Sequence, residues 1–181
     1  ALKDFEIILK LDPTYGWAIN NRALIFGKQG KYELQIAEYT KAIAINPDDP
    51  LYYSNRGLTY RDDLEDYDNA LSDFTKAIEL DIKNPERYVY RANCYVAMKE
   101  YTNALKDYDK AKAFYDEALA ENVNAFHIYP HYINVLLWNE DYEEAERFIA
   151  FGLTVKGSDK AVLHYKKAIL FEQQTKYKDA L

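Results

Sequence analysis

The chain has 181 residues, and its 23 Lys and Arg against 30 Asp and Glu give a formal net charge of −7. Hydrophobic residues make up 49% of the chain and include 18 Tyr. This is enough apolar side chain to offset the entropy of ordering, so the composition excludes a disordered chain. The negative charge gives no general attraction to phosphate backbones or anionic lipid, and we therefore expect no nucleic-acid binding and no membrane binding.

Cys94 is the single cysteine, which excludes an intramolecular disulfide and a thiolate metal cluster. No run of about 18 apolar residues predicts a membrane-spanning helix, and the first residues lack the layout of a signal peptide. These features fit a reducing compartment, and we expect a cytoplasmic location. The chain does not begin with Met, so we also expect it to be part of a longer protein.

A repeated pattern runs through the chain. Five tyrosines follow one another at intervals of 35, 34, 41 and 35 residues: Tyr32, Tyr67, Tyr101, Tyr142 and Tyr177. Before each of them a large, a small and a large residue are spaced by four and then three, as in Ile19, Ala23 and Phe26. This spacing puts all three on one helical face. After each of the first four tyrosines a large and a small residue follow three apart, as in Tyr39 and Ala42. Each repeat is therefore predicted to be two amphipathic helices joined by a short turn.

In chain order, we expect a single all-α array that begins with half a repeat at 1–13. Four full repeats follow at 16–49, 50–84, 85–121 and 125–157, and a partial repeat occupies 159–181. The turn before Tyr67 is one residue longer than its counterparts. The extra residues after Ala111 continue an apolar face, which predicts one long helix reaching Ala120. In the partial repeat, a helix at 159–174 is expected to end before another begins at Tyr177.

The period and lettering resemble the tetratricopeptide repeat (TPR), whose unit of roughly 34 residues carries a W-x2-L-G-x2-Y…A-x3-F…P pattern. Pro13 and Pro47 stand where that pattern ends a unit. The resemblance covers almost the whole chain and implies a right-handed α–α superhelix of antiparallel helix pairs. It also implies a non-catalytic scaffold that binds a peptide or helix of a partner protein in its concave groove.

Arginine stands at the family's Leu position in the first three full repeats, as Arg22, Arg56 and Arg91. We expect their stems to cover apolar surface while the guanidinium lies in water or on a carboxylate. A ladder of arginines that contacts a ligand stays open as the alternative.

No residue pattern predicts catalysis or a cofactor. His127 and His131 are four apart, a spacing that metal sites use, but Pro130 favours the first turn of a helix and would leave His127 near or outside its start. We interpret both as ordinary groove or core histidines. Acidic clusters at the turns are interpreted as helix caps, and Cys94 as a small buried residue. No phosphate-binding loop and no nucleophile motif is present, so we expect no enzyme activity, no metal and no cofactor.

The resemblance places one face of each first helix in the groove. Asn side chains there suit a peptide backbone because they both donate and accept hydrogen bonds, and large apolar groups offer pockets for anchor residues. The predicted groove residues are Trp17, Asn20, Asn21, Leu24, Lys28, Ser54, Asn55, Leu58, Arg61, Val89, Tyr90, Asn93, His131, Asn134 and Trp138.

One subtype of the family grips the C-terminal carboxylate of acidic tails with Lys and Asn on one first helix, Asn on the next, and Lys and Arg on the third. Asn55 matches the middle Asn. The other four positions hold Asn20, Leu24, Glu86 and Tyr90, which do not match. We therefore expect no tight binding of acidic C-terminal tails.

Two other functions stay open. An architectural piece of a larger protein would pack on other domains or self-associate through uncapped ends, and abundant Tyr suits an interface. An RNA-binding helical repeat is the more distant alternative, since the charge of −7 opposes it.

Overall fold

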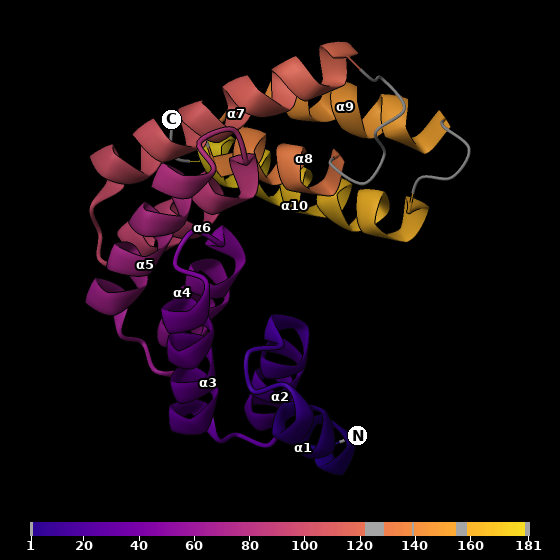
Figure 1. The fold of residues 1–181 in the computed structure, drawn as a ribbon. Coiled ribbons are helices and arrows are strands. Elements are labelled where there is room, and N and C mark those ends of the chain that lie inside the picture. The colour runs from indigo at the N-terminus through magenta and orange to yellow at the C-terminus, as the bar shows by residue number, and fades with distance from the viewer. Residues whose placement is uncertain (1, 122–128, 139, 155–158, 180–181) are drawn as a thin grey trace. The chain divides into compact units, whose positions relative to one another are not determined.

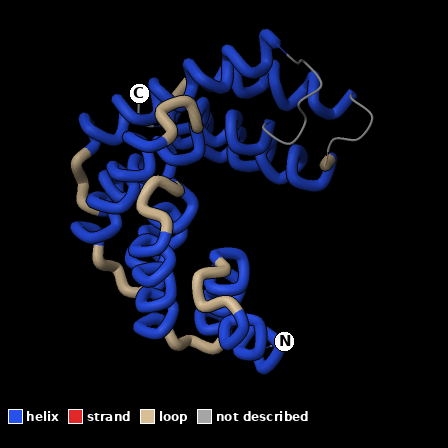
Figure 2. Tube along the Cα trace, in the orientation of Figure 1, coloured by secondary structure: helices blue, strands red, loops and turns tan. Residues whose placement is uncertain are grey.

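The computed structural model describes residues 2–121, 129–138, 140–154 and 159–179, and every regular element in these ranges is an α-helix (Figure 2). They form two compact units, Ala1–Glu100 and Tyr101–Leu181. The first contains α1 (Leu2–Leu11), α2 (Gly16–Lys28), α3 (Tyr32–Ile45), α4 (Pro50–Asp63), α5 (Tyr67–Leu80) and α6 (Pro85–Ala97). The second contains α7 (Tyr101–Glu121), α8 (Tyr129–Trp138), α9 (Tyr142–Thr154) and α10 (Lys160–Asp179) (Figure 1). Continuity of one array across both units stays a prediction.

Within each unit, helices pack on their neighbours in the chain, as in a solenoid. In the first unit each helix contacts the next, and α4 also contacts α6. In the second unit α8 and α10 contact each other and both pack on α9. First helices of successive repeats therefore also contact each other, α4 with α6 and α8 with α10. None of the helices in the described residues has the length and apolar character needed to cross a membrane.

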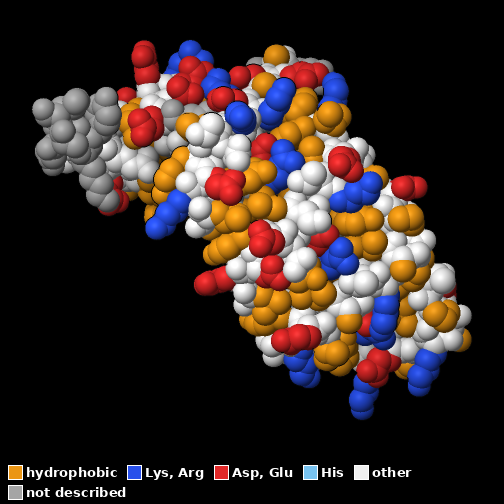
Figure 3. Space-filling model, turned by 90° about the vertical axis from the view of Figure 1, so that its left-hand side faces the viewer, with side chains coloured by type: hydrophobic (Ala, Val, Ile, Leu, Met, Phe, Trp, Pro, Cys, Tyr) orange, Lys and Arg blue, Asp and Glu red, His pale blue; other side chains and the backbone are white. Residues whose placement is uncertain are grey.

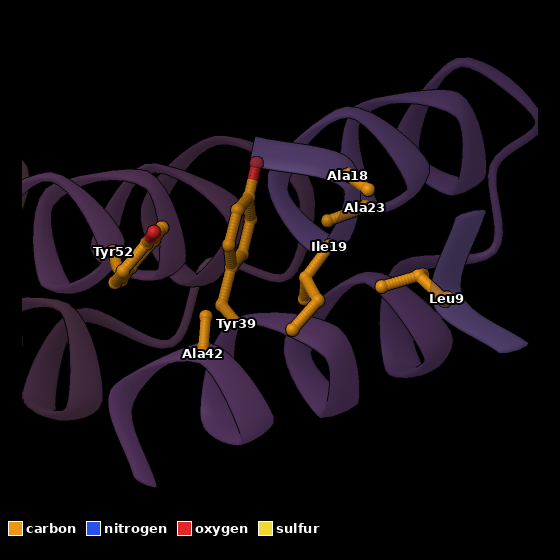
Figure 4. Packing of buried hydrophobic residues seen from close by; sticks show 7 residues of the cluster. All are labelled: Leu9, Ala18, Ile19, Ala23, Tyr39, Ala42 and Tyr52. Carbon is orange, nitrogen blue, oxygen red and sulfur yellow. The ribbon is translucent and has the colours of Figure 1, made fainter. Parts of the chain in front are cut away.

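Small residues at the centre of the repeat pattern allow this packing. A Cβ atom on Gly57 would lie 2.8 Å from the Phe74 ring, so α4 and α5 approach at a distance that no larger residue fits. In the first unit, one core cluster joins four helices, with side chains that converge in Figure 4: Leu9, Ala18, Ile19, Ala23, Tyr39, Ala42 and Tyr52. The large-small-large pattern thus forms the core.

The turn from first to second helix is built the same way four times. Two residues before each of the first four repeat tyrosines the backbone is left-handed, with φ of 69° at Gly30, 52° at Glu65, 62° at Lys99 and 60° at Glu140. The next N–H returns to a carbonyl in the last turn of the first helix, as from Lys31 to Phe26 at 2.9 Å. This bond satisfies a helix-end carbonyl, as in the Schellman motif. The bond from Asp66 to Tyr60 spans one more residue, which confirms the longer turn before Tyr67.

Two length predictions had different outcomes. Helix α7 reaches Glu121, which confirms the long helix predicted to Ala120. The predicted helix end before Tyr177 is wrong, because α10 continues without a break from Lys160 to Asp179. Thr175 stands where the other copies have their left-handed residue, and a β-branched side chain disfavours that conformation. Instead its hydroxyl donates to the Phe171 carbonyl at 2.8 Å within the helix.

Candidate functional site

The first helices of the first unit, α2, α4 and α6, each present a stripe of the predicted groove residues. On α2 the stripe contains Trp17, Asn21, Leu24 and Lys28, which recur at intervals of three or four and so share one face. Hydrogen bonds and ring contacts join the three stripes, as described below. We call this surface the α2–α4–α6 face.

The apolar part of this face is open to solvent. Trp17 is 57% exposed, Leu24 42% and Leu51 46%. The Trp17 ring is nevertheless held in place, because Phe5 meets it edge-on at 5.5 Å and Tyr15 lies 6.1 Å away. A large apolar side chain that is exposed but supported by its neighbours can receive an anchor residue with little loss of its own freedom.

Asparagine amides lie beside these apolar groups. Asn55 Nδ2 donates to Asn20 Oδ1 at 3.0 Å, which links α4 to α2. Asn21 Nδ2 donates to the Trp17 carbonyl at 2.7 Å. Each amide has further donor and acceptor capacity, so the pair of Asn20 and Asn55 can both accept from and donate to a peptide backbone.

Arg61 links α4 to α6. Its guanidinium lies over the rings of Phe74 and Tyr90, with centroid distances of 5.8 and 5.7 Å. It donates to the Tyr90 carbonyl at 3.3 Å and to both carboxylate oxygens of Asp62 at 2.5 and 2.9 Å. Burial raises the pKa of Tyr90, and the negative charge of the Glu86 carboxylate raises it further. Arg61 therefore supports the α2–α4–α6 face and is already paired with a carboxylate.

Other predicted groove residues of the first unit lie deeper. Ser54 is buried, and Leu58 packs beside Phe74 and Cys94 in the second core cluster. Val89 and Asn93 are half-buried, while Lys28 is exposed. The structure thus brings Trp17, Asn20, Asn21, Leu24 and Asn55 to the surface together, whereas Ser54 and Leu58 belong mainly to the packing between helices.

In the second unit, Trp138 and Asn134 lie on α8. Trp138 is 50% exposed and stacks on the buried Tyr108 at 5.7 Å with 19° between the ring planes. Asn134 is half-buried. His127 lies outside the described residues, and so does the side chain of His131. Within the ranges that the structure describes, no three His, Cys, Asp or Glu side chains are grouped to hold a metal ion.

The repeat arginines lie against polar side chains of second helices. Arg22 binds Glu38 through Nε at 2.9 Å and Nη2 at 2.5 Å. Arg56 binds both Asp73 carboxylate oxygens at 2.7 and 2.8 Å, and this hydrogen bonding is the main cause of its raised pKa. Arg91 donates to Thr75 Oγ1 at 3.0 Å. For Arg22 and Arg56 this confirms the predicted position on a carboxylate.

Two features were not recognised in the sequence. The buried acids Glu38 and Asp73 each stand one residue before a core aromatic, a recurrence that is visible in the sequence and matches the arginine series. Phe5 and Tyr15, which support Trp17, carry no signal of their own because their role depends on how α1 packs on α2. Cys94 is buried as predicted, and burial raises the pKa of its thiol to about 11.

The visible charge distribution is mixed. On the face shown in Figure 3, basic and acidic side chains lie next to one another among hydrophobic ones. This face therefore shows no broad area of a single charge of the kind that attracts a phosphate backbone.

Helix pairs that pack on their neighbours in the chain, joined within each pair by a recurring left-handed turn, define a TPR-type α-helical solenoid. Models of the TPR repeat match residues 24–62 and 48–120, together more than half of the chain. The chain belongs to the tetratricopeptide repeat family.

Relatives include serine/threonine-protein phosphatase 5 of Homo sapiens, 40% identical over 83 residues, which are 46% of this chain and 16% of that protein. Hsp70-Hsp90 organizing protein 2 of Arabidopsis thaliana is 36% identical over 103 residues, 57% of this chain and 18% of that protein. The chain thus spans under a fifth of the length of these relatives.

Solved structures with the same fold include the first TPR of Spaghetti (RPAP3) bound to the HSP90 peptide SRMEEVD. Its TM-score is 0.52 at 25% identity, over 66% of this chain and 91% of that one. A crystal structure of MamA has a TM-score of 0.58 at 15% identity, over 97% of this chain and 90% of that one. The MamA likeness concerns the fold alone.

Proposed function

We propose that this chain is a non-catalytic scaffold that binds a peptide or helix of a partner protein on the α2–α4–α6 face. The observation that carries the proposal is the exposed Trp17, Leu24 and Leu51 beside the linked amides of Asn20 and Asn55. Apolar groups bind side chains of a partner, while the amides bind its backbone. A TPR of RPAP3, 25% identical to this chain, is bound to an HSP90 peptide, which supports a peptide ligand for the fold.

The chemistry of the face favours an uncharged, apolar-anchored segment over an acidic tail. Arg61 is already paired with Asp62 and covered by aromatic rings. Glu86 is exposed on α6 and would repel a terminal carboxylate. Calorimetry with the peptide SRMEEVD is expected to give no micromolar binding, and micromolar affinity would contradict this part of the proposal.

The two tryptophans allow a direct test, because one lies in each unit. In a Trp138→Phe background, Trp17 alone reports on the first unit. Peptides selected from a random library against the full chain are expected to change Trp17 emission saturably, and to be enriched in large apolar residues. Selected peptides that bind without changing Trp17 emission, and without weakening on Trp17→Ala substitution, would refute the proposed face.

A second candidate function is self-association or packing on another domain. Leu11 is 84% exposed and Ile7 is exposed one turn before it on α1, and such groups favour an interface. Light scattering over a concentration series separates the two candidates, since a monomer at all concentrations contradicts self-association. We further propose that the chain binds no RNA, which an electrophoretic shift assay at low and high salt tests.

A further inference from the structure

A second surface feature lies on a different side of α2. A pocket of about 330 Å³ opens where α1, α2 and α3 meet, lined by Glu6, Leu9, Lys10, Pro13, Arg22 and Lys41. At 100° per residue, Arg22 projects about 140° around α2 from Trp17. The pocket is therefore separate from the α2–α4–α6 face.

The arginine at this pocket has a donor to spare, unlike its counterpart one repeat later. Arg56 uses all three nitrogens, two on Asp73 and Nη1 on Thr40 Oγ1 at 2.8 Å. Arg22 uses Nε and Nη2 on Glu38, and Nη1 has no hydrogen-bond partner in the described part of the chain. Thr40 stands 16 residues before Arg56, and the residue 16 before Arg22 is Glu6. In the described residues no hydrogen bond joins Glu6 to Arg22.

The pocket is also locally positive in an acidic chain. Lys10 and Lys41 join Arg22 at its wall. Lys41 Nζ donates to Glu38 Oε1 at 3.0 Å, and the Glu38 side chain is only 6% exposed beneath these cations. Three cations against the carboxylates of Glu38 and Glu6 leave a surplus of one positive charge, where the whole chain carries −7.

We propose that this pocket binds a compact oxyanion, namely the carboxylate or phosphate group of a ligand or partner. Arg22 Nη1 and the ammonium groups of Lys10 and Lys41 supply charge-assisted donors. Leu9 and Pro13 provide an apolar wall for the carbon atoms that carry the anion. At roughly 30 Å³ for each water molecule, the volume holds about ten waters, which is room for such a group but not for a folded segment.

The experiment titrates the full chain, at constant ionic strength, with inorganic phosphate and separately with succinate. Binding is followed by NMR signals of the arginine Nε–H groups and lysine side chains. The test variant is Lys10→Ala. Lys3→Ala is the matched control, since it removes the same charge from an exposed position on α1, two turns before Lys10, that does not line the pocket. Both substitutions are at exposed positions, so both variants are expected to fold.

We expect a saturable shift of the Arg22 Nε–H signal, with the affinity about fivefold weaker in Lys10→Ala and unchanged in Lys3→Ala. Saturation by either anion supports the proposal, and the tighter one identifies a phosphate or a carboxylate ligand. Absence of a saturable shift with both anions, or equal weakening by both substitutions, would overturn it.

Discussion

The two units fill the same repeat position with different chemistry. In the first unit that position holds Arg22 and Arg56, each bound to a buried carboxylate of the following helix. In the second unit it holds Tyr132, which is fully buried between rings from two helices. Phe148 of α9 meets it edge-on at 4.7 Å, and Tyr115 of α7 lies 5.8 Å away.

Both solutions join a first helix to a second helix, but their energetics differ. A partly buried ion pair contributes only modest net stability. Removing one of its partners is costly, however, because the other charge is then left buried and unpaired. A buried aromatic cluster contributes through apolar burial and packing. At this position two full repeats of the first unit thus use an arginine with an acid, and the full repeat of the second unit uses a tyrosine with aromatic neighbours.

The largest expected effect is in the aromatic unit. Tyr132→Ala should lower the free energy of unfolding by about 4 kcal/mol, because it leaves a cavity among packed rings. The measurement is urea denaturation followed by Trp138 emission in a Trp17→Phe background. Tyr132→Phe is the control: it removes only the hydrogen bond to Asp116, whose side chain is 48% exposed, and should cost about 1 kcal/mol. Equal losses in the two variants would contradict a packing role.

Breaking the ion pair of the first unit should cost slightly less. Arg56→Met leaves the Asp73 carboxylate, 6% exposed, without its cation, and we expect a loss of about 3 kcal/mol. The readout is Trp17 emission in a Trp138→Phe background. Arg56→Met/Asp73→Leu should recover most of this loss, since two apolar side chains need no pairing. A double variant as unstable as the single one would show that the ion pair itself provides the stability.

The turns offer a smaller and matched comparison between the units. Glu65 and Glu140 both have a left-handed backbone, so Glu65→Gly and Glu140→Gly should each stabilise their unit by about 1 kcal/mol in urea denaturation. Thr175→Gly is the contrast, because that residue lies inside α10 and glycine weakens a helix by a few tenths of a kcal/mol. A stabilising Thr175→Gly would argue for a turn at this position.

The thiol of Cys94 allows burial in the first unit to be tested without a substitution. Cys94 is the single cysteine, and its pKa of about 11 compares with 9.0 for a free thiol. Because the folded pKa is raised, the thiol favours the unfolded state increasingly as pH rises from about 9 to about 11. Labelling by a disulfide reagent at pH 8 should be slow in the native chain and fast in urea. Equally fast labelling in both would contradict the burial of Cys94.

The regular spacing of the repeat tyrosines predicted the helix pairs, because each copy of the repeat has the same apolar pattern and the same turn. It failed at α10 because the tyrosine at 177 matches the repeat while Thr175 does not suit the left-handed turn. The candidate face was predicted less completely. Spacing places residues on one side of a helix, but the exposure of Leu24 and the burial of Ser54 depend on how closely neighbouring helices approach. The hydrogen bond between Asn20 and Asn55 depends on the same distance.

The central claim, that the α2–α4–α6 face binds a partner segment, is tested most directly by a matched pair of leucines. Leu24 lies on that face and is 42% exposed, while Leu34 lies on α3 and is 48% exposed. The measurement is the affinity of a library-selected peptide for Leu24→Ala and Leu34→Ala by calorimetry. We predict that Leu24→Ala weakens binding about tenfold, or 1.4 kcal/mol, and that Leu34→Ala leaves it unchanged. Equal affinities for the two variants, or weakening by Leu34→Ala alone, would contradict the claim.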